Sequence, residues 1–271
     1  MEKILYLDCF SGISGDMTLA ALIDAGASLK YINEQLNLLL ASSVTLKVKT
    51  VNKKGISAKQ LEILLDPKVV PVNRNYSAIR AMINESPLVP DVKKNALAIF
   101  QVIAEAEAKI HGVQVEQVHF HEIGAIDSII DIVGVALALK SLDIDQVFAG
   151  PVPLGSGRIS IEHGIYPNPA PATLEILKGK TINLLDLQYE ITTPTGAGIV
   201  AALASQAINL PQVSVEAIGY GAGTLDLPDR PNVLRAYVGQ VDHLSYQRPN
   251  LNFEQYGDAL NKGEIQMKEL E

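Results

Sequence analysis

One segment near the middle of the chain is apolar on nearly every side of the helix that its periodicity predicts. Residues 125–139 carry isoleucine, valine or leucine at eight positions. A helix of this composition is buried on all sides, so the rest of the chain must fold in layers that cover it. Asp127 and Asp131 interrupt the pattern, and because they are four residues apart they share one helical face. Carboxylates in a buried helix are costly unless a metal, a base or hydrogen-bond donors compensate for them.

Two histidines and a glutamate lie just before this helix. His119 and His121 are two residues apart in a segment that we expect to be extended, which points both side chains to one face. Glu122 follows, and Gly124 permits a turn into the helix. Taken singly, Asp127 can be a helix cap and His119 a hydrogen-bonded histidine in a half-buried strand. Together, these titratable groups in one strand-turn-helix unit favour a functional site.

The chemistry of that site stays open between metal binding and acid–base catalysis. Histidines with carboxylates suit divalent transition metals, but their spacing here is not that of a closed structural zinc site.

Composition narrows the class of protein. With 271 residues, 48% of them hydrophobic, the chain can bury the core of one large domain or of two closely packed ones. A formal net charge of −8 argues against nucleic-acid binding, which needs a basic surface. The single cysteine excludes an internal disulfide framework and fits a reducing compartment. Since no apolar run is long enough to span a bilayer and the N-terminus lacks a signal-peptide pattern, we expect a cytoplasmic protein without membrane contact.

Periodicity and turn residues predict a mixture of strands and helices. We expect strands at residues 4–9, 44–51, 56–64, 147–152, 213–218 and 233–238. We expect helices at residues 17–25, 29–40, 76–84, 91–110, 125–139, 172–177 and 197–204. The pattern predicts an α/β or α+β fold, with a mixed sheet, flanking helices and an antiparallel hairpin insertion at 44–64. One large domain covers 1–241, and 242–271 reads as a polar tail or linker.

A glycine-containing loop lies between the first strand and the first helix. Ser11, Gly12, Ser14 and Gly15 offer backbone N–H groups and hydroxyls at a helix N-terminus, which suit a phosphate. The loop is neither a Walker A motif nor Gly-x-Gly-x-x-Gly, so an ordinary tight turn is the alternative. Asp8, Cys9 and Asp16 flank this loop. Cys9 beside a helix N-terminus can have a lowered pKa and bind a soft metal, although a buried, inert cysteine is the commoner outcome.

Three later loops also carry groups that suit a ligand. Residues 155–158 end in Arg158, whose guanidinium can hold a phosphate or carboxylate with two hydrogen bonds. Thr193, Thr195 and Gly196 precede the helix at 197–204, where the hydroxyls can instead be simple caps. Residues 219–223, with three glycines, are expected to form a flexible loop.

Taken together, these segments resemble the LarC family of nickel-insertion proteins. The resemblance rests on residues 8–17, 119–131, 151–155, 163–164 with 169–173, 193–197 and 219–223. It implies a lyase-class enzyme, a cyclometallase, that inserts nickel into pyridinium-3,5-bisthiocarboxylic acid mononucleotide in a CTP-dependent reaction. The product is the nickel-pincer cofactor of lactate racemase. Forming a nickel–carbon bond requires loss of a ring proton, so a base must lie near that carbon.

With this resemblance, the candidate residues take roles as a hypothesis. Proton-transfer candidates are His121, Glu122 and Asp127. Metal-binding candidates are His119, His121, Asp127, Asp131, Asp8, Cys9 and Asp16. Candidates to hold the nucleotide phosphate are Ser11, Gly12, Ser14, Gly15, Arg158, Thr193, Thr195 and Gly196.

Two departures from the family pattern bear on the expected activity. Members usually continue into a C-terminal domain that binds CTP with its divalent metal, Mg or Mn, and we expect that domain to lie beyond this chain. The histidine-rich loop of many members is absent, since residues 67–76 contain no histidine. We therefore expect the N-terminal substrate- and metal-binding part of the enzyme, as a homo-oligomer. The alternatives are a non-catalytic nickel chaperone and a divalent-metal phosphohydrolase.

Overall fold

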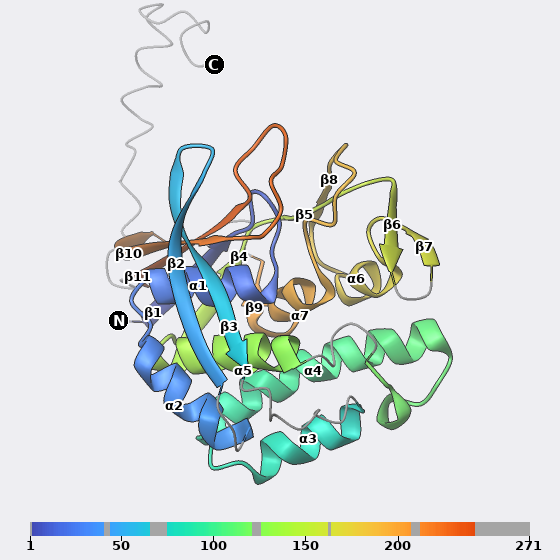
Figure 1. The fold of residues 1–271 in the computed structure, drawn as a ribbon, viewed down its shortest axis with the longest axis horizontal. Helices are drawn as coiled ribbons and strands as arrows, with labels where there is room; N and C mark the ends of the chain where they lie inside the picture. The colour runs from blue at the N-terminus through green and yellow to red at the C-terminus, as the bar shows by residue number, and fades with distance from the viewer. Residues whose placement is uncertain are drawn as a thin grey trace, which may run out of the picture.

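A mixed seven-stranded sheet forms one layer of the molecule, with strand order β2-β3-β10-β11-β1-β4-β9 (Figure 1). The computed structural model describes residues 2–40, 44–65, 75–120, 126–161, 164–206 and 212–241. The strands of this sheet are β1 (Glu2–Asp8), β2 (Val44–Lys53), β3 (Ile56–Leu65), β4 (Gln146–Ala149), β9 (Ala204–Ser205), β10 (Val213–Ala222) and β11 (Val233–Val241). β1 pairs antiparallel with β11 and parallel with β4, so the predicted mixed sheet is confirmed.

The predicted antiparallel hairpin is confirmed, with strands slightly longer than expected. β2 and β3 pair from Val44 opposite Leu65 to Lys53 opposite Ile56. The two-residue turn between them has φ of 48° at Lys54 and 92° at Gly55, as the tight turns of twisted hairpins require. β3 also pairs with β10, where Lys59 lies opposite Gly221, so the hairpin extends the edge of the sheet.

The helices pack in layers against the sheet and one another. They are α1 (Gly15–Asp24), α2 (Leu29–Leu40), α3 (Tyr76–Glu85), α4 (Pro90–His111), α5 (Ile126–Ser141), α6 (Pro171–Ile176) and α7 (Pro194–Leu203), with a short 3-10 turn at Val115–Gln117. α1 contacts β10, β3 and β11, while α5 contacts α1, α2 and α4. Every residue of α5 from Ile132 to Leu139 is buried, which confirms the central helix expected from residues 125–139.

The segment 219–223 corrects one expectation, because residues 219–222 belong to strand β10 and not to a flexible loop. A Cβ atom at Gly219 would lie 2.0 Å from the Ala21 carbonyl oxygen, and one at Gly221 would lie 1.9 Å from that of Met17. The glycines let α1 lie directly on the backbone of β10, a known use of glycine within a strand.

Several smaller elements differ from the prediction. The strand expected at 147–152 is two strands, β4 and β5 (Val152–Leu154), and β5 pairs with β8 (Ile182–Leu184) outside the main sheet. The intervening Pro151 has no N–H group to continue the ladder. β6 (Arg158–Ile161) and β7 (Gly164–Pro167) form a separate antiparallel pair that the sequence analysis missed.

The segment before α5 is less regular than expected. His119 makes only an isolated bridge with Asn75, and residues 121–125 lie outside the described ranges. The predicted tail at 242–271 also falls outside them. Within the described ranges, none of the helices has the length and apolarity needed to cross a membrane.

Candidate functional site

Two loops that are distant in sequence run side by side and set the geometry of the site. The Ile13 backbone N–H donates to the Ile191 carbonyl at 3.0 Å, and the Thr193 N–H donates to the Ile13 carbonyl at 3.1 Å. This parallel bridge joins the loop before α1 to the loop before α7. As a result, the N-termini of α1 and α7 meet.

Glycines make this close approach possible. Gly12 has φ of +100°, and a Cβ there would lie 1.8 Å from the Ile191 carbonyl oxygen. A Cβ at Gly196 would lie 2.0 Å from the Ile13 carbonyl oxygen. Since no side chain fits at either position, both glycines have a structural function in joining the loops.

A cleft of about 220 Å³ opens where the two helices begin. It is lined by Ser14, Gly15, Asp16, Ser128, Asp131, Glu190, Thr193, Pro194 and Thr195. Three of the four predicted phosphate-binding hydroxyls (Ser14, Thr193 and Thr195) and two of the predicted metal ligands (Asp16 and Asp131) therefore line one space. The carboxylates of Asp16 and Glu190 in that lining favour a cationic ligand over a bare phosphate.

The two hydroxyls at the helix starts act as caps. Ser14 Oγ accepts from the Met17 N–H at 3.4 Å and donates to the Asp16 carboxylate. Thr193 Oγ1 accepts from the Gly196 N–H at 3.2 Å. The alternative reading of the threonines as caps is thus confirmed for Thr193.

Asp131 is the most perturbed acid of the cleft. Its Oδ1 atom is buried and has no hydrogen-bond partner among the described residues. A Cβ added to Gly15 would lie 2.8 Å from Asp131 Oδ2, which shows how tightly the start of α1 covers this carboxyl. Burial raises the pKa of Asp131 well above its ordinary value, and the charges of Asp16 and Asp127 raise it further, against a smaller opposing effect of the Asp16 backbone N–H. Asp131 therefore holds a proton at a pH where ordinary carboxyls are ionised.

Comparison with known proteins identifies the family. The sequence profile described as "Nickel insertion protein" matches residues 5–266. The chain belongs to this family. It is 50% identical over 257 residues to the pyridinium-3,5-bisthiocarboxylic acid mononucleotide nickel insertion protein of Geobacillus kaustophilus, covering 92% of this chain and 62% of that protein. It is 51% identical over 236 residues to the protein of the same name from Staphylococcus saprophyticus, covering 87% of this chain and 60% of the relative.

The chain thus spans about three-fifths of the length of these relatives. No solved structure matches it.

In this member of the nickel insertion family, two other candidate residues, Asp8 and Cys9, lie at the end of β1. Neither is among the residues that line the cleft. Asp8 accepts from Arg235 Nε at 3.0 Å, and this hydrogen-bonded pairing raises the pKa of Arg235. Cys9 is 2% exposed. Burial, with a smaller effect of the Asp8 charge, raises the pKa of the Cys9 thiol to about 12. Of the two alternatives for Cys9, the structure contradicts the lowered pKa and agrees with the commoner one, a buried cysteine, because desolvation of the thiolate outweighs the nearby helix N-terminus.

The remaining predicted residues are dispersed. Ser11 is buried and donates from Oγ to the Pro231 carbonyl at 2.6 Å, while Arg158 is exposed at the start of β6 and is not among the cleft-lining residues. His119 is exposed, with Nδ1 2.8 Å from Asn75 Oδ1. Asp127 is exposed one helical turn before Asp131. His121 and Glu122 lie outside the described ranges.

Two lining residues with polar side chains that could contact a ligand, Ser128 and Glu190, were missed by the sequence analysis. Ser128 lies three residues before Asp131, so helical spacing alone places both on one face. Glu190 closely precedes the threonine loop and carries no comparable signal. Within the described ranges, no three histidine, cysteine, aspartate or glutamate side chains are arranged to hold a metal ion, so Asp16 and Asp131 form at most part of a metal site there.

Proposed function

We propose that this chain takes part in inserting nickel into pyridinium-3,5-bisthiocarboxylic acid mononucleotide, and that the reaction occurs at the cleft between α1, α5 and α7. The names of its relatives support the reaction. The observation that carries the location is the buried Asp131 carboxyl, whose Oδ1 has no partner within the described ranges and which has Asp16 beside it. Buried carboxyls with a strongly raised pKa are found preferentially where proton transfer occurs.

The proposed reaction balances with one base. The ring carbon loses a proton to the base and keeps the electron pair, which forms the bond to Ni²⁺. Two thiocarboxylate sulfurs of the mononucleotide complete the pincer. Asp131 accepts the proton in its ionised form, and a divalent cation entering the cleft favours that form by lowering its pKa. Nickel is a substrate of this reaction.

The acidic lining also suits the ring of the mononucleotide. A pyridinium nitrogen carries a positive charge, which Asp16 and Glu190 can stabilise from the cleft wall. In our proposal Ser14, Thr193 and Thr195 contact the polar substituents of the ligand. His121 and Glu122 stay candidates for metal binding or proton transfer, and Arg158 for holding the phosphate.

The finer parts of the proposal follow the family resemblance. We propose that the reaction requires CTP with Mg or Mn, and that both are bound outside the domain at 1–241. We also propose that the reaction is a lyase-type cyclometallation in the cytoplasm, and that its product is delivered to lactate racemase. A homo-oligomer belongs to the same set of proposals.

The test combines calorimetry with mass spectrometry. We expect the purified chain to bind both Ni²⁺ and the mononucleotide, each tightening the other. With CTP and Mg²⁺ or Mn²⁺, we expect a product in which nickel replaces one ring hydrogen. We expect this product either from the chain alone or from the chain mixed with the C-terminal part of a relative. Asp131→Asn should lower the rate by about 10²–10⁴-fold, the usual contribution of a general base. The matched control is Asp91→Asn, which alters an exposed carboxylate of the first turn of α4.

Other results would redirect the assignment. Nickel binding without affinity for the mononucleotide would support the chaperone alternative. Turnover of simple phosphate esters with Mg²⁺ or Mn²⁺ would support the phosphohydrolase. Nickel transfer by Asp131→Asn at the wild-type rate would remove Asp131 from the reaction.

A further inference from the structure

An aromatic ring is exposed on the loop that leads into the cleft. Phe10 lies between β1 and α1 and is 55% exposed, although Phe100 and Phe120 are buried in the core. Single exposed apolar side chains are common on protein surfaces and carry no meaning by themselves. The surroundings of Phe10 are unusual because its loop is fixed and a cation lies over its ring.

The backbone around Phe10 is held at several points. The Gly12 N–H donates to the Cys9 carbonyl at 2.8 Å, which closes a tight turn that includes Phe10. Ser11 Oγ donates to the Pro231 carbonyl at 2.6 Å and so ties this turn to the loop between β10 and β11. The ring is therefore presented from a rigid turn, and little conformational entropy is lost when a ligand contacts it.

Arg230 lies over one side of the ring. Its guanidinium carbon is 5.9 Å from the ring centroid of Phe10, within the range of a cation–π contact. Arg230 Nη2 also donates to Asp229 Oδ2 at 2.7 Å, so its charge is partly balanced.

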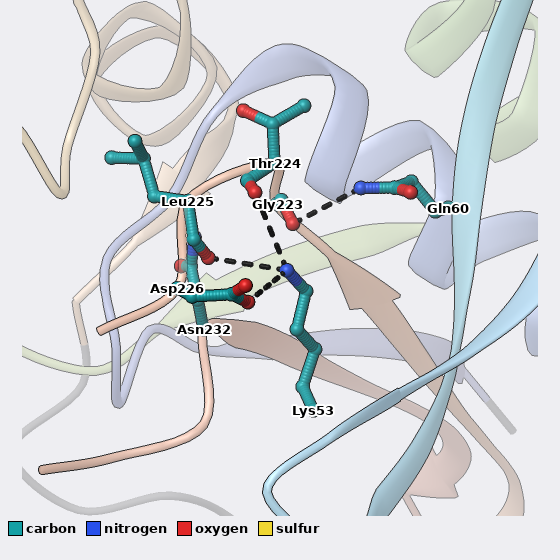
Figure 2. A network of polar contacts seen from close by, with 7 residues as sticks. All are labelled: Lys53, Gln60, Gly223, Thr224, Leu225, Asp226 and Asn232. Atoms are coloured by element: carbon teal, nitrogen blue, oxygen red, sulfur yellow. Dashed lines mark hydrogen bonds and ion pairs between the residues drawn. The ribbon is translucent and has the colours of Figure 1, made fainter. Parts of the chain in front are cut away.

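The loop that carries Arg230 is anchored by the tip of the β2–β3 hairpin (Figure 2). Lys53 Nζ reaches Asp226 Oδ1 at 2.7 Å and the Leu225 carbonyl at 3.2 Å. Gln60 Nε2 donates to the Gly223 carbonyl at 3.2 Å from the same hairpin, and Asn232 Nδ2 to the Leu225 carbonyl at 3.0 Å within the loop. With the Lys53 side chain only 11% exposed, this network is a framework that holds Arg230 in place.

The ring also lies near the proposed reaction site. Ser14, which lines the cleft, is four positions after Phe10, and four extended residues span at most about 14 Å. The turn at Cys9–Gly12 shortens that reach. Phe10 is not itself a cleft-lining residue, but a mononucleotide that contacts its ring is within reach of the cleft.

We infer that Phe10 is the stacking platform for the pyridinium ring of the substrate, a role that rests on the proposed function. A positively charged, electron-poor ring is attracted to the face of a phenyl ring, and the side opposite Arg230 is where it binds. The anionic thiocarboxylate substituents then lie within the field of the Arg230 guanidinium. Phe10 is a binding and positioning residue, and the proton transfer stays with the cleft carboxyl.

The absence of tryptophan from the chain makes this contact directly measurable. Phe10→Trp introduces a single indole, whose fluorescence a stacked pyridinium ring quenches. We expect quenching by pyridinium-3,5-bisthiocarboxylic acid mononucleotide and by nicotinic acid mononucleotide, and none by uridine monophosphate at equal concentration. If uridine monophosphate quenched the fluorescence equally, the inference that Phe10 selectively stacks on a pyridinium ring would be overturned.

Affinity measurements on the otherwise unlabelled chain complete the test. By calorimetry, Phe10→Leu should weaken binding of the bisthiocarboxylated mononucleotide about 3- to 30-fold, the range of a cation–π contact. Leu38→Ala is the control, because Leu38 has a matching exposure of 56% on α2. Unchanged affinity of Phe10→Leu, with normal binding by the wild type, would overturn this inference alone. Failure of the wild-type chain to bind the mononucleotide would overturn the proposed function and this inference with it.

Discussion

Replacing Gly196 by alanine tests whether the two loops must touch for the site to exist. The added methyl group would lie 2.0 Å from the Ile13 carbonyl oxygen and 2.5 Å from its carbon. Real Cβ atoms essentially never come within 3.0 Å of such an atom, so the loops must separate by at least about 1 Å. The obstacle is backbone, which cannot turn away as the end of a side chain can.

The expected cost follows from the hydrogen bonds between the loops. The Ile13–Ile191 and Thr193–Ile13 bonds are 3.0 and 3.1 Å long, and a 1 Å separation takes both beyond hydrogen-bonding range. Losing two backbone bonds in a buried setting costs about 1–3 kcal/mol each. The better helix propensity of alanine returns about 1 kcal/mol. We therefore expect Gly196→Ala to lower the free energy of unfolding by about 1–5 kcal/mol.

Gly134→Ala in α5 is the matched control, since it has the same chemical change and the same gain in helix propensity. Its methyl group would meet Leu19 Cδ2 at 2.6 Å, which is the end of a side chain that can move. We expect a change within about 1 kcal/mol, measured for both variants from urea denaturation at constant m-value. Mononucleotide binding should be lost only in Gly196→Ala. Equal stability of the two variants would refute the argument that the loops need this contact.

Two further predictions concern titratable groups. Burial raises the pKa of Asp131 in the folded chain above the unfolded value of about 3.9. The contribution of the protonated Asp131 to stability is therefore fully present below about pH 3.9 and is lost as the pH rises through the folded-state pKa. The free energy of unfolding falls over this range by up to about 1.4 kcal/mol per pH unit. Asp131→Asn should remove this slope from the urea midpoint in metal-free buffer, and parallel wild-type and variant curves would contradict the raised pKa. The Cys9 thiol, whose pKa burial raises to about 12, should resist alkylation at pH 8 in the folded chain and react once urea unfolds it; rapid labelling of the folded chain would contradict its burial.

Local patterns predicted the parts of the fold that local forces determine. The apolar segment at 125–139 is helix α5, since burial on all sides leaves a helix as its stable form. The hairpin was predictable because a two-residue turn and alternating strands specify its register without help from the rest of the chain. The capping position of Thr193 follows from the threonine and proline at the helix start.

Long-range contacts account for what the sequence did not reveal. Glycines at 219 and 221 were interpreted as a local signal of flexibility, but their cause is helix α1 packed against the strand. Gly12 and Gly196 were assigned to phosphate binding, yet each avoids a backbone atom of the other loop. The burial that raises the pKa of Cys9 was the commoner of the two alternatives, but neighbouring residues in the sequence could not decide between them. The sequence patterns therefore identified Ser14, Gly15, Thr193 and Thr195, which line the cleft with Asp16 and Asp131. They did not show why the two loops meet.

Asp131 ties the energetics of the fold to its proposed chemistry. At this buried face of α5 an apolar residue would be more stable than a carboxyl whose Oδ1 has no partner in the part of the chain that the structure describes. Proteins keep a destabilising buried carboxyl of this kind where it takes part in binding or catalysis. In the metal-free chain the carboxyl reduces this destabilisation by keeping its proton, whereas a divalent cation in the cleft would stabilise the ionised form and release that proton. In the proposed function, nickel binding, proton release and stability would be coupled through this one side chain, and the same coupling would prepare the base that the proposed ring deprotonation needs.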